Sequence, residues 1–250
     1  MGHASTGLDF LLPSSPMPVT KSIRRIGSAP SSSAETLAQR AHRELRAALM
    51  RGDFLPGTAL TLRALAERLG TSIMPVREAV SRLAAERALE LQPNRAIVVP
   101  ELSRREIDEL WRIRCLIESD AAALAAEVAT EDEIGRMAEI TDAMWQALSR
   151  RDVHTFVEGT GLWAMQLANS SHSEPFIGYI SNLRLRCAPH IAAAFGGDIS
   201  AEDPFFRFSL PLQEQITEAI REHDAARTRD LRAADIRTFH AYVYKRLRWA

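Results

Sequence analysis

The sequence predicts a mainly α-helical protein, in which an N-terminal winged helix-turn-helix is followed by an all-helical antiparallel bundle of six or seven helices. Residues 34–100 contain three short helical patterns and then two short β-like runs. Residues 101–250 consist of longer segments with apolar residues at helical spacing. Turn and capping residues separate these segments, which supports a division into a small domain at 34–100 and a helical domain at 101–250.

Composition is compatible with two modest globular domains. The chain has 250 residues, of which 46% are hydrophobic and 25% are charged. No apolar run approaches the roughly 18–20 residues that a membrane span needs. The two cysteines, Cys115 and Cys187, lie in apolar helical patterns and are expected to be buried free thiols. We therefore expect a cytoplasmic protein that does not bind membranes.

Charge is distributed unevenly along the chain. Residues 1–100 carry 13 Lys and Arg against 8 Asp and Glu, whereas residues 101–250 carry 18 against 24. A basic first part indicates that this part contacts a polyanion. Chance variation between the two parts is the alternative interpretation.

Residues 1–33 are rich in Ser, Pro and Gly and lack periodicity, so we predict a disordered tail. Lys21, Arg24 and Arg25 lie in this tail. They are expected to be solvated, with contact to DNA phosphates as the alternative.

The first two helices are predicted from apolar spacing and from their boundaries. Helical spacing runs from residue 34 to residue 50, and Gly52 ends it. A short helix follows at 61–69, with Thr61 as its N-cap and Gly70 as its terminator. Gly70 also permits a tight turn before the third helix, because glycine reaches positive φ without strain.

The third helix and the segment after it complete the small domain. Ser72 is expected to cap the third helix, and Pro75 lies in its first turn. Two β-like runs at 89–92 and 97–99 flank a turn, which predicts a small hairpin. Three helices followed by a hairpin are typical of a winged helix-turn-helix.

Six helices are predicted in the second domain. Capping boxes at Ser103–Glu106 and Thr130–Glu133 open the first two, and Asp224 is expected to cap the last. Residues 196–204 contain the longest loop. The predicted helices are 103–128, 131–150, 153–170, 175–194, 209–222 and 225–248. Their pattern favours an antiparallel bundle.

Specific motifs resemble the GntR family of bacterial regulators. They are MRGDFLPG at residues 50–57, LAERLG at 65–70 and PVREAV at 75–80. LWRIRCLIE at 110–118 and AAALAA at 121–126 resemble the start of the helical effector domain, of FCD type, in the FadR-like branch. The resemblance covers about residues 36–248. It implies a transcriptional regulator, expected to be a repressor, that binds DNA as a homodimer.

The resemblance also indicates which residues contact DNA. The N-terminus of the recognition helix points its N–H groups at the DNA backbone, and an arginine one turn later can contact a guanine edge or a phosphate. Arg63 corresponds to a contacting arginine of relatives, and the wing tip can reach a minor groove. The predicted contact residues are Arg63, Ser72, Ile73, Pro75, Arg77, Asn94 and Arg95. An ion pair with Glu78 or Glu67 is the alternative role for Arg77, and simple solvation is the alternative for Arg63 and Arg95.

Three positions depart from the family pattern. Ile73 stands where relatives carry an arginine, so a polar DNA contact is replaced by a possible contact with a thymine methyl group. Arg87 stands where relatives carry glycine, at a cost of about 1 kcal/mol if the backbone there is left-handed. Ala96 replaces a wing glycine. The operator of a relative therefore cannot be transferred to this chain.

Many FadR-like domains hold a divalent metal with an acid and three histidines, but this sequence lacks those histidines. The corresponding positions carry Ala164, Gln213 and Asp235. Alanine has no ligand atom, and glutamine is a weak neutral ligand. The remaining histidines show no paired ligand spacing. We therefore predict no metal and no other cofactor, and keep an unusual metal-dependent site as the alternative.

A small-molecule pocket is expected to persist in the bundle without the metal. Thr160, Trp163, Gln213 and Asp235 replace or adjoin the ligand positions. Arg114 and Arg184 are candidates to bind an effector carboxylate, with ion pairing to helical acids such as Glu118 as the alternative. Asp235 would need Arg114, Gln213 or water as a partner, or would have a raised pKa.

The predicted function is a sequence-specific DNA-binding regulator that recognises an inverted repeat. A small effector, expected to be an organic acid, would control its affinity for the operator. An enzyme fused to a DNA-binding domain is a second alternative, but the chain has no glycine-rich phosphate loop and no nucleophile elbow. Its only lysines, Lys21 and Lys245, are not placed for a Schiff base. We therefore predict that it is not an enzyme.

Overall fold

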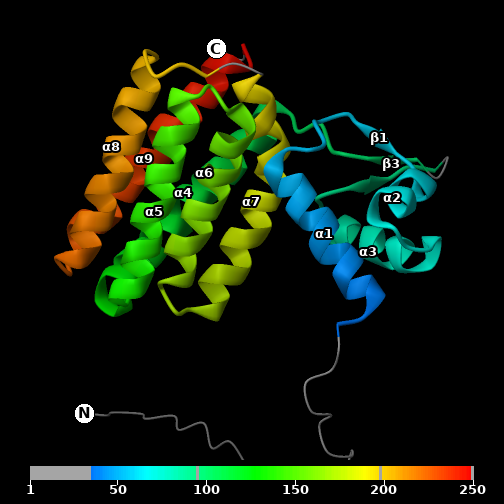
Figure 1. Ribbon diagram of the computed structural model, residues 1–250, viewed down its shortest axis with the longest axis horizontal. Coiled ribbons are helices and arrows are strands. Elements are labelled where there is room, and N and C mark those ends of the chain that lie inside the picture. The colour runs from blue at the N-terminus through cyan, green and yellow to red at the C-terminus, as the bar shows by residue number, and fades with distance from the viewer. Residues whose placement is uncertain (1–34, 94–95, 197–198, 249–250) are drawn as a thin grey trace, which may run out of the picture. The chain divides into compact units, whose positions relative to one another are not determined.

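The computed structural model describes residues 35–93, 96–196 and 199–248, which form nine helices and three short strands (Figure 1). The predicted tail at 1–33 and the wing-tip residues Asn94 and Arg95 lie outside the described residues. Glu35–Ala250 forms one compact unit. Within the described ranges, every helix is too short or too polar to cross a membrane.

The first helices have the predicted boundary residues. Helix α1 (Leu37–Arg51) begins with a capping box at Thr36 and ends at Gly52, whose φ is +78°. Helix α2 (Leu62–Leu69) is capped by Thr61, whose side chain accepts from the amide of Ala64, and ends at Gly70. Helix α3 (Ile73–Ala85) follows directly. The predicted helix-turn-helix is therefore present.

The strands form a three-stranded sheet rather than only a hairpin. Strand β3 (Ile97–Val98) pairs antiparallel with β2 (Glu90–Leu91), as predicted, and on its other side with β1 (Ala59–Leu60). Strand β1 was not predicted, because two residues between a turn and a helix cap show no periodicity.

A single hydrophobic core holds α1–α3 and the sheet together. We call this part, residues 37–99, the reading head. Leu45, Leu49, Val76 and Leu83 are almost completely buried in it. Leu185 of the bundle is buried in the same core.

Six longer helices form the bundle (Figure 1). They are α4 (Arg104–Val128), α5 (Glu131–Ser149), α6 (Val153–Asn169), α7 (Glu174–Phe195), α8 (Pro204–Arg221) and α9 (Ala225–Arg246). Both predicted capping boxes are present, and Asp224 caps α9. Helix α4 packs mainly against α9, α5 against α6, and α8 against α9.

Helix α8 begins at Pro204, not at residue 209 as predicted. The sequence pattern places the Asp203–Pro204 pair in a loop. In the structure the Asp203 carboxylate accepts from the amide of Phe205 at 2.9 Å, and Pro204 occupies the first helical position. Proline is well suited to that position, because its missing N–H has no helical partner there anyway. The extra turn adds Phe205 and Phe206 to the bundle core.

Candidate DNA-binding surface and buried pocket

The first turn of α3 presents a mixture of polar and apolar groups to solvent. Ser72 stands at the N-cap, but its side chain makes no capping hydrogen bond. Ile73 and Met74 are exposed by 42% and 70%, and Pro75 is half-buried. The N-terminus of the helix is therefore accessible to a ligand, as a recognition helix requires.

The two arginines predicted to contact DNA differ in their surroundings. Arg63 pairs with Glu67 in α2 at 3.0 Å, and both side chains are exposed. Arg77 is exposed and forms no ion pair within the described ranges. Its neighbour Glu78 pairs instead with Arg82 at 2.6 Å. The guanidinium of Arg77 is thus available for an external partner.

Arg87 has the left-handed backbone that its position in the sequence suggested, with φ of +58°. Helix α3 ends at Ala85, and the chain turns sharply before β2. An arginine in this conformation costs about 1 kcal/mol relative to glycine.

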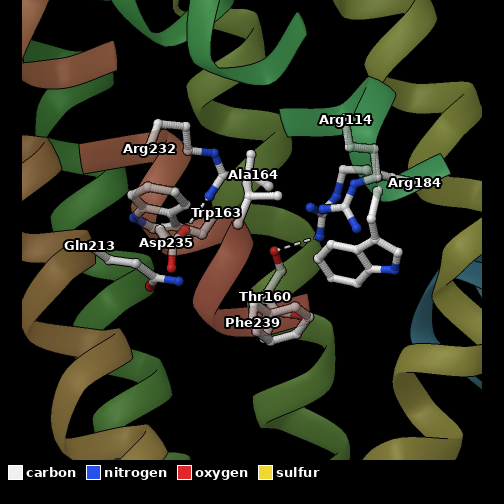
Figure 2. A pocket seen from close by; sticks show the side chains of 11 residues that line it. Arg114, Thr160, Trp163, Ala164, Arg184, Gln213, Arg232, Asp235 and Phe239 are labelled. Carbon is white, nitrogen blue, oxygen red and sulfur yellow. Dashed lines mark hydrogen bonds and ion pairs between the residues drawn. The ribbon is translucent and has the colours of Figure 1, made fainter. Parts of the chain in front are cut away.

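All six residues predicted to bind an effector line one pocket in the bundle (Figure 2). Arg114 comes from α4, Thr160 and Trp163 from α6, Arg184 from α7, Gln213 from α8 and Asp235 from α9. The remaining lining residues are Trp111, Ala164, Arg232, Ile236 and Phe239. Five of the six bundle helices therefore contribute side chains to a cavity of about 20 Å³, which accommodates one or two water molecules.

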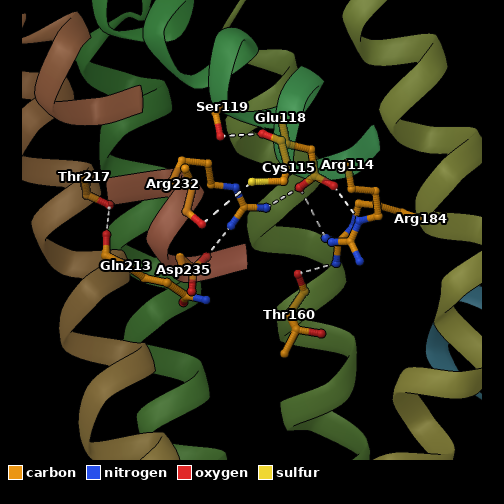
Figure 3. Close-up of polar contacts among 11 residues, drawn as sticks. Arg114, Cys115, Glu118, Ser119, Thr160, Arg184, Gln213, Thr217, Arg232 and Asp235 are labelled. Atoms are coloured by element: carbon orange, nitrogen blue, oxygen red, sulfur yellow. Dashed lines mark hydrogen bonds and ion pairs between the residues drawn. The ribbon is translucent and has the colours of Figure 1, made fainter. Parts of the chain in front are cut away.

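Buried ion pairs cross the pocket (Figure 3). Glu118 accepts from Arg114 at 2.6 Å and also from Arg232, and it lies 3.8 Å from Arg184. Asp235 accepts from Arg232. All five residues are at most 5% exposed. Three buried guanidinium groups thus share two carboxylates, and the cluster carries one excess positive charge when both acids are ionised.

These contacts shift the pKa values of the cluster. Burial alone would raise the pKa of Glu118, but the charges of Arg114, Arg232 and Arg184 outweigh burial and lower it to about 2. Burial and the nearby charge of Arg114 lower the pKa of Arg184 to about 9. Burial raises the pKa of Asp235, although Arg232 opposes that effect. Glu118 is thus firmly ionised, whereas the charge of Asp235 depends on its arginine.

Arg232 was not among the predicted pocket residues, and the prediction for Asp235 was partly wrong. The partner of Asp235 is Arg232 rather than Arg114 or Gln213. The three-residue spacing of Arg232 and Asp235 on one helix was the available signal. For Arg114, the alternative of an ion pair with Glu118 is what the structure shows.

Several polar atoms in the pocket have no hydrogen-bond partner within the described residues. They are Arg114 Nη1, Trp163 Nε1, Arg184 Nε, Arg232 Nε and Gln213 Oε1. Arg184 does donate through its other end, to the carbonyl of Thr160 at 2.9 Å (Figure 2). Buried polar atoms are nearly always hydrogen-bonded in folded proteins. Four unpartnered donors and one acceptor therefore surround this one cavity.

Two family models match this chain. One, described as bacterial regulatory proteins of the gntR family, matches residues 37–99, and the other, the FCD domain, matches residues 109–238. The FCD match alone covers more than half of the chain. The chain belongs to the gntR family of bacterial regulatory proteins. Its reading head is the GntR domain, and its bundle is the FCD domain.

Individual GntR relatives give the same result. McbR, an HTH-type transcriptional regulator of Escherichia coli (strain K12), is 33% identical over 154 residues, which cover 62% of this chain and 70% of McbR. The transcriptional repressor RspR of the same strain is 28% identical over 120 residues, which cover 48% of this chain and 53% of RspR. The chain is thus a DNA-binding transcriptional regulator, and the alternative of an enzyme fusion is wrong.

Solved GntR structures share the fold. E. coli McbR/YncC superposes with a TM-score of 0.79 at 28% identity, over 85% of this chain and 99% of that one. A GntR-type regulator from Rhodococcus sp. RHA1 has a TM-score of 0.66 at 20% identity, over 83% of this chain and 97% of that one. The second likeness concerns the fold alone.

The pocket does not fit the metal that many FadR-like GntR regulators are expected to hold. At the three histidine positions, Ala164 offers no ligand atom, Gln213 offers an amide, and Asp235 is already paired with Arg232. Among the described residues, no group of three His, Cys, Asp or Glu side chains is placed to hold a metal ion. The buried guanidinium groups would moreover repel a dication.

Proposed function

We propose that this GntR regulator is a dimeric repressor whose affinity for an inverted-repeat operator is controlled by an organic acid bound in the FCD pocket, without a metal. The observation that carries this proposal is the buried cluster of three arginines and two acids, whose excess charge is positive and whose N–H groups are partly unpartnered. A carboxylate would neutralise the excess charge and accept from those donors. The proposal places the protein in the cytoplasm, where bacterial DNA lies.

The size of the pocket supports a regulatory role. An acid with several heavy atoms does not fit into about 20 Å³, so the side chains around the cavity must move when it binds. Arg232 is held by Glu118 and Asp235, both of which compete with a ligand carboxylate for it. Binding of the acid is therefore expected to rearrange the contacts between α4 and α9. The acid would then bind one arrangement of these helices more tightly than the other, which is what shifts the population between two conformations.

A screen of short organic acids tests the effector. Each acid is compared with the primary amide of the same carbon skeleton in a thermal-shift assay of the full chain. Acids are expected to raise the melting temperature and amides are not, because only the carboxylate neutralises the cluster. The acid with the largest shift is then added to a gel-shift assay and is expected to weaken DNA binding.

Matched variants locate the binding site. Arg114→Met and Arg184→Met are expected to abolish the thermal shift, whereas Arg105→Met, at an exposed site on α4, is expected to keep it. An unchanged shift in both pocket variants, with native circular dichroism, would rule out this pocket.

A further inference from the structure

The exposed apolar residues at the start of α3 are not explained by the fold. Val76, Ala79 and Val80 form the buried stripe of this helix, whereas Ile73 and Met74 are exposed by 42% and 70%. Isolated exposed apolar residues are common on proteins. Here, however, two large exposed apolar side chains are adjacent. They lie in the first turn of α3, which is the end of a recognition helix that contacts DNA.

Positive charge flanks this apolar tip. The same open surface is lined by Arg63, Thr71 and Ser72, and Arg77 follows one turn after Ile73. Arg77 forms no ion pair within the described ranges, and the pair between Arg63 and Glu67 is exposed, so solvent and salt weaken it. Both cations are therefore available to a phosphate or a base edge. An apolar centre with cationic flanks fits a nucleic-acid groove rather than an apolar protein partner.

Only one feature of the major groove is apolar. Guanine and adenine present N7 with O6 or an amino group, cytosine presents an amino group, and thymine presents O4 and its C5-methyl group. Side chains of isoleucine and methionine cannot pair with the polar edges, and they would leave those edges without water or a partner. We propose that Ile73 and Met74 recognise thymine C5-methyl groups, so that the operator carries thymine where the tip of α3 meets the bases.

This inference rests on the proposed binding to an operator, and it concerns how the operator is distinguished from other DNA. Removing one methyl contact is expected to reduce affinity about fourfold, the equivalent of about 0.8 kcal/mol for one buried CH₂ group. In a symmetric operator the loss occurs in both half-sites, which gives about sixteenfold.

Replacement of thymine by deoxyuridine tests the proposal, because the two bases differ only in the C5-methyl group. An operator is first obtained by in vitro selection with the full chain, and each thymine is then replaced in turn in both half-sites. Gel-shift titration is expected to show a loss of about sixteenfold at one or two positions. The Ile73→Ala/Met74→Ala variant should bind the thymine operator more weakly and lose this discrimination.

Arg63→Ala provides the matched control. It removes a charge next to the apolar tip, so it should weaken binding to the thymine and deoxyuridine operators equally. Both apolar side chains are exposed, so their truncation should leave the melting temperature unchanged. Selection of no DNA would refute the proposed function. A selected operator that tolerates deoxyuridine everywhere, or a double variant that still discriminates, would overturn the methyl recognition alone.

Discussion

Arg184 and Leu185 are neighbours in helix α7, but their side chains belong to different parts of the protein. The Arg184 guanidinium donates to the Thr160 carbonyl in the pocket at 2.9 Å, whereas Leu185 is completely buried in the core of the reading head. One turn earlier, the Asn182 amide donates to the carbonyl of Glu86, which caps the end of α3, at 3.3 Å. A movement of α7 at the pocket would therefore act directly on the recognition helix.

Substitutions of Arg184 and Leu185 are expected to have separate effects, one on acid binding and the other on stability. Arg184→Met should weaken acid binding and leave DNA binding without acid unchanged. Leu185→Ala should destabilise the protein by about 2–5 kcal/mol, because it leaves a cavity in the core of the reading head, while acid binding persists. Titration calorimetry with the acid from the screen measures acid binding, gel shift measures DNA binding, and urea denaturation measures stability. Tyr179→Ala, at an exposed site of the same helix, should change neither, and equal defects in Arg184→Met and Leu185→Ala would contradict this separation.

Arg77→Ala should abolish specific operator binding and leave the dimer intact. A bidentate contact with a base is worth about 1–3 kcal/mol, and a symmetric dimer loses it in each half-site. Gel-shift titration measures the change, and sedimentation checks the dimer. Arg105→Ala, at an exposed site of the bundle, is the control. A change of less than threefold would show that Arg77 is not a contact residue.

Arg232→Met should be far more destabilising than Arg229→Met, although both arginines lie on α9 and pair with acids of α4. Loss of Arg232 leaves Asp235 buried without its cation, at a cost of about 3–5 kcal/mol. Arg229 pairs with Asp120 at the surface, where a pair is worth about 1 kcal/mol or less. Urea denaturation measures both. Asp235→Asn should partly rescue Arg232→Met, and equal losses in the two single variants would contradict the buried network.

His190 should make stability depend on pH between about 4 and 6.5. It is buried in α7, where Nε2 accepts from the amide of Leu102 at 3.1 Å, and burial lowers its pKa to about 4. In the unfolded chain His190 binds a proton below about pH 6.5, whereas in the folded chain it binds one only below about pH 4. The free energy of unfolding therefore falls by up to about 3 kcal/mol as the pH decreases from 6.5 to 4.

Glutamine at position 190 supplies an acceptor without titrating, so His190→Gln is the matched control. Urea denaturation of both proteins from pH 4 to 7 isolates the histidine, because other titrating groups contribute equally. Parallel curves for the two proteins would show that His190 is not responsible.

The full chain, purified without a chelator, should contain no stoichiometric zinc or nickel. The pocket provides no imidazole at the three positions where metal-holding relatives carry one, and even two such losses should weaken metal binding far beyond the 10–100-fold typical of changes around a metal ligand. Elemental analysis of tag-free protein measures the content. Near-stoichiometric metal, together with a lower melting temperature on addition of a chelator, would support the metal-dependent alternative.

The sequence predicted the elements whose signals are local. Thr61, Gly70 and Ser103 define helix ends through hydrogen bonds to residues three or four positions away, so their role is visible in a short window. The buried charges could not be predicted in the same way. The pair of Glu118 and Arg232 joins residues 114 positions apart, and it depends on how α4 packs against α9.

Position within a helix also explains why some pocket residues were predicted from the sequence and Arg232 was not. The family pattern marks one position on each of three helices, namely Ala164, Gln213 and Asp235. Thr160 and Trp163 were predicted because they adjoin the first of these positions. Arg232 lies on the helix of Asp235, but no family position marks it, and an arginine in an otherwise charged helix is usually exposed. Only the neighbours across the bundle show that it is buried.

The two cysteines differ in accessibility, which makes it possible to measure movement of α4 with a label on one of them. Cys187 is completely buried, and burial raises the pKa of its thiol, so it reacts slowly with electrophiles. Cys115 is only partly buried, on α4 beside Arg237. One spin label or fluorophore can therefore be attached to the natural sequence at a single site, one turn before Glu118. Spectroscopy of that label would follow α4 in solution without any engineered substitution.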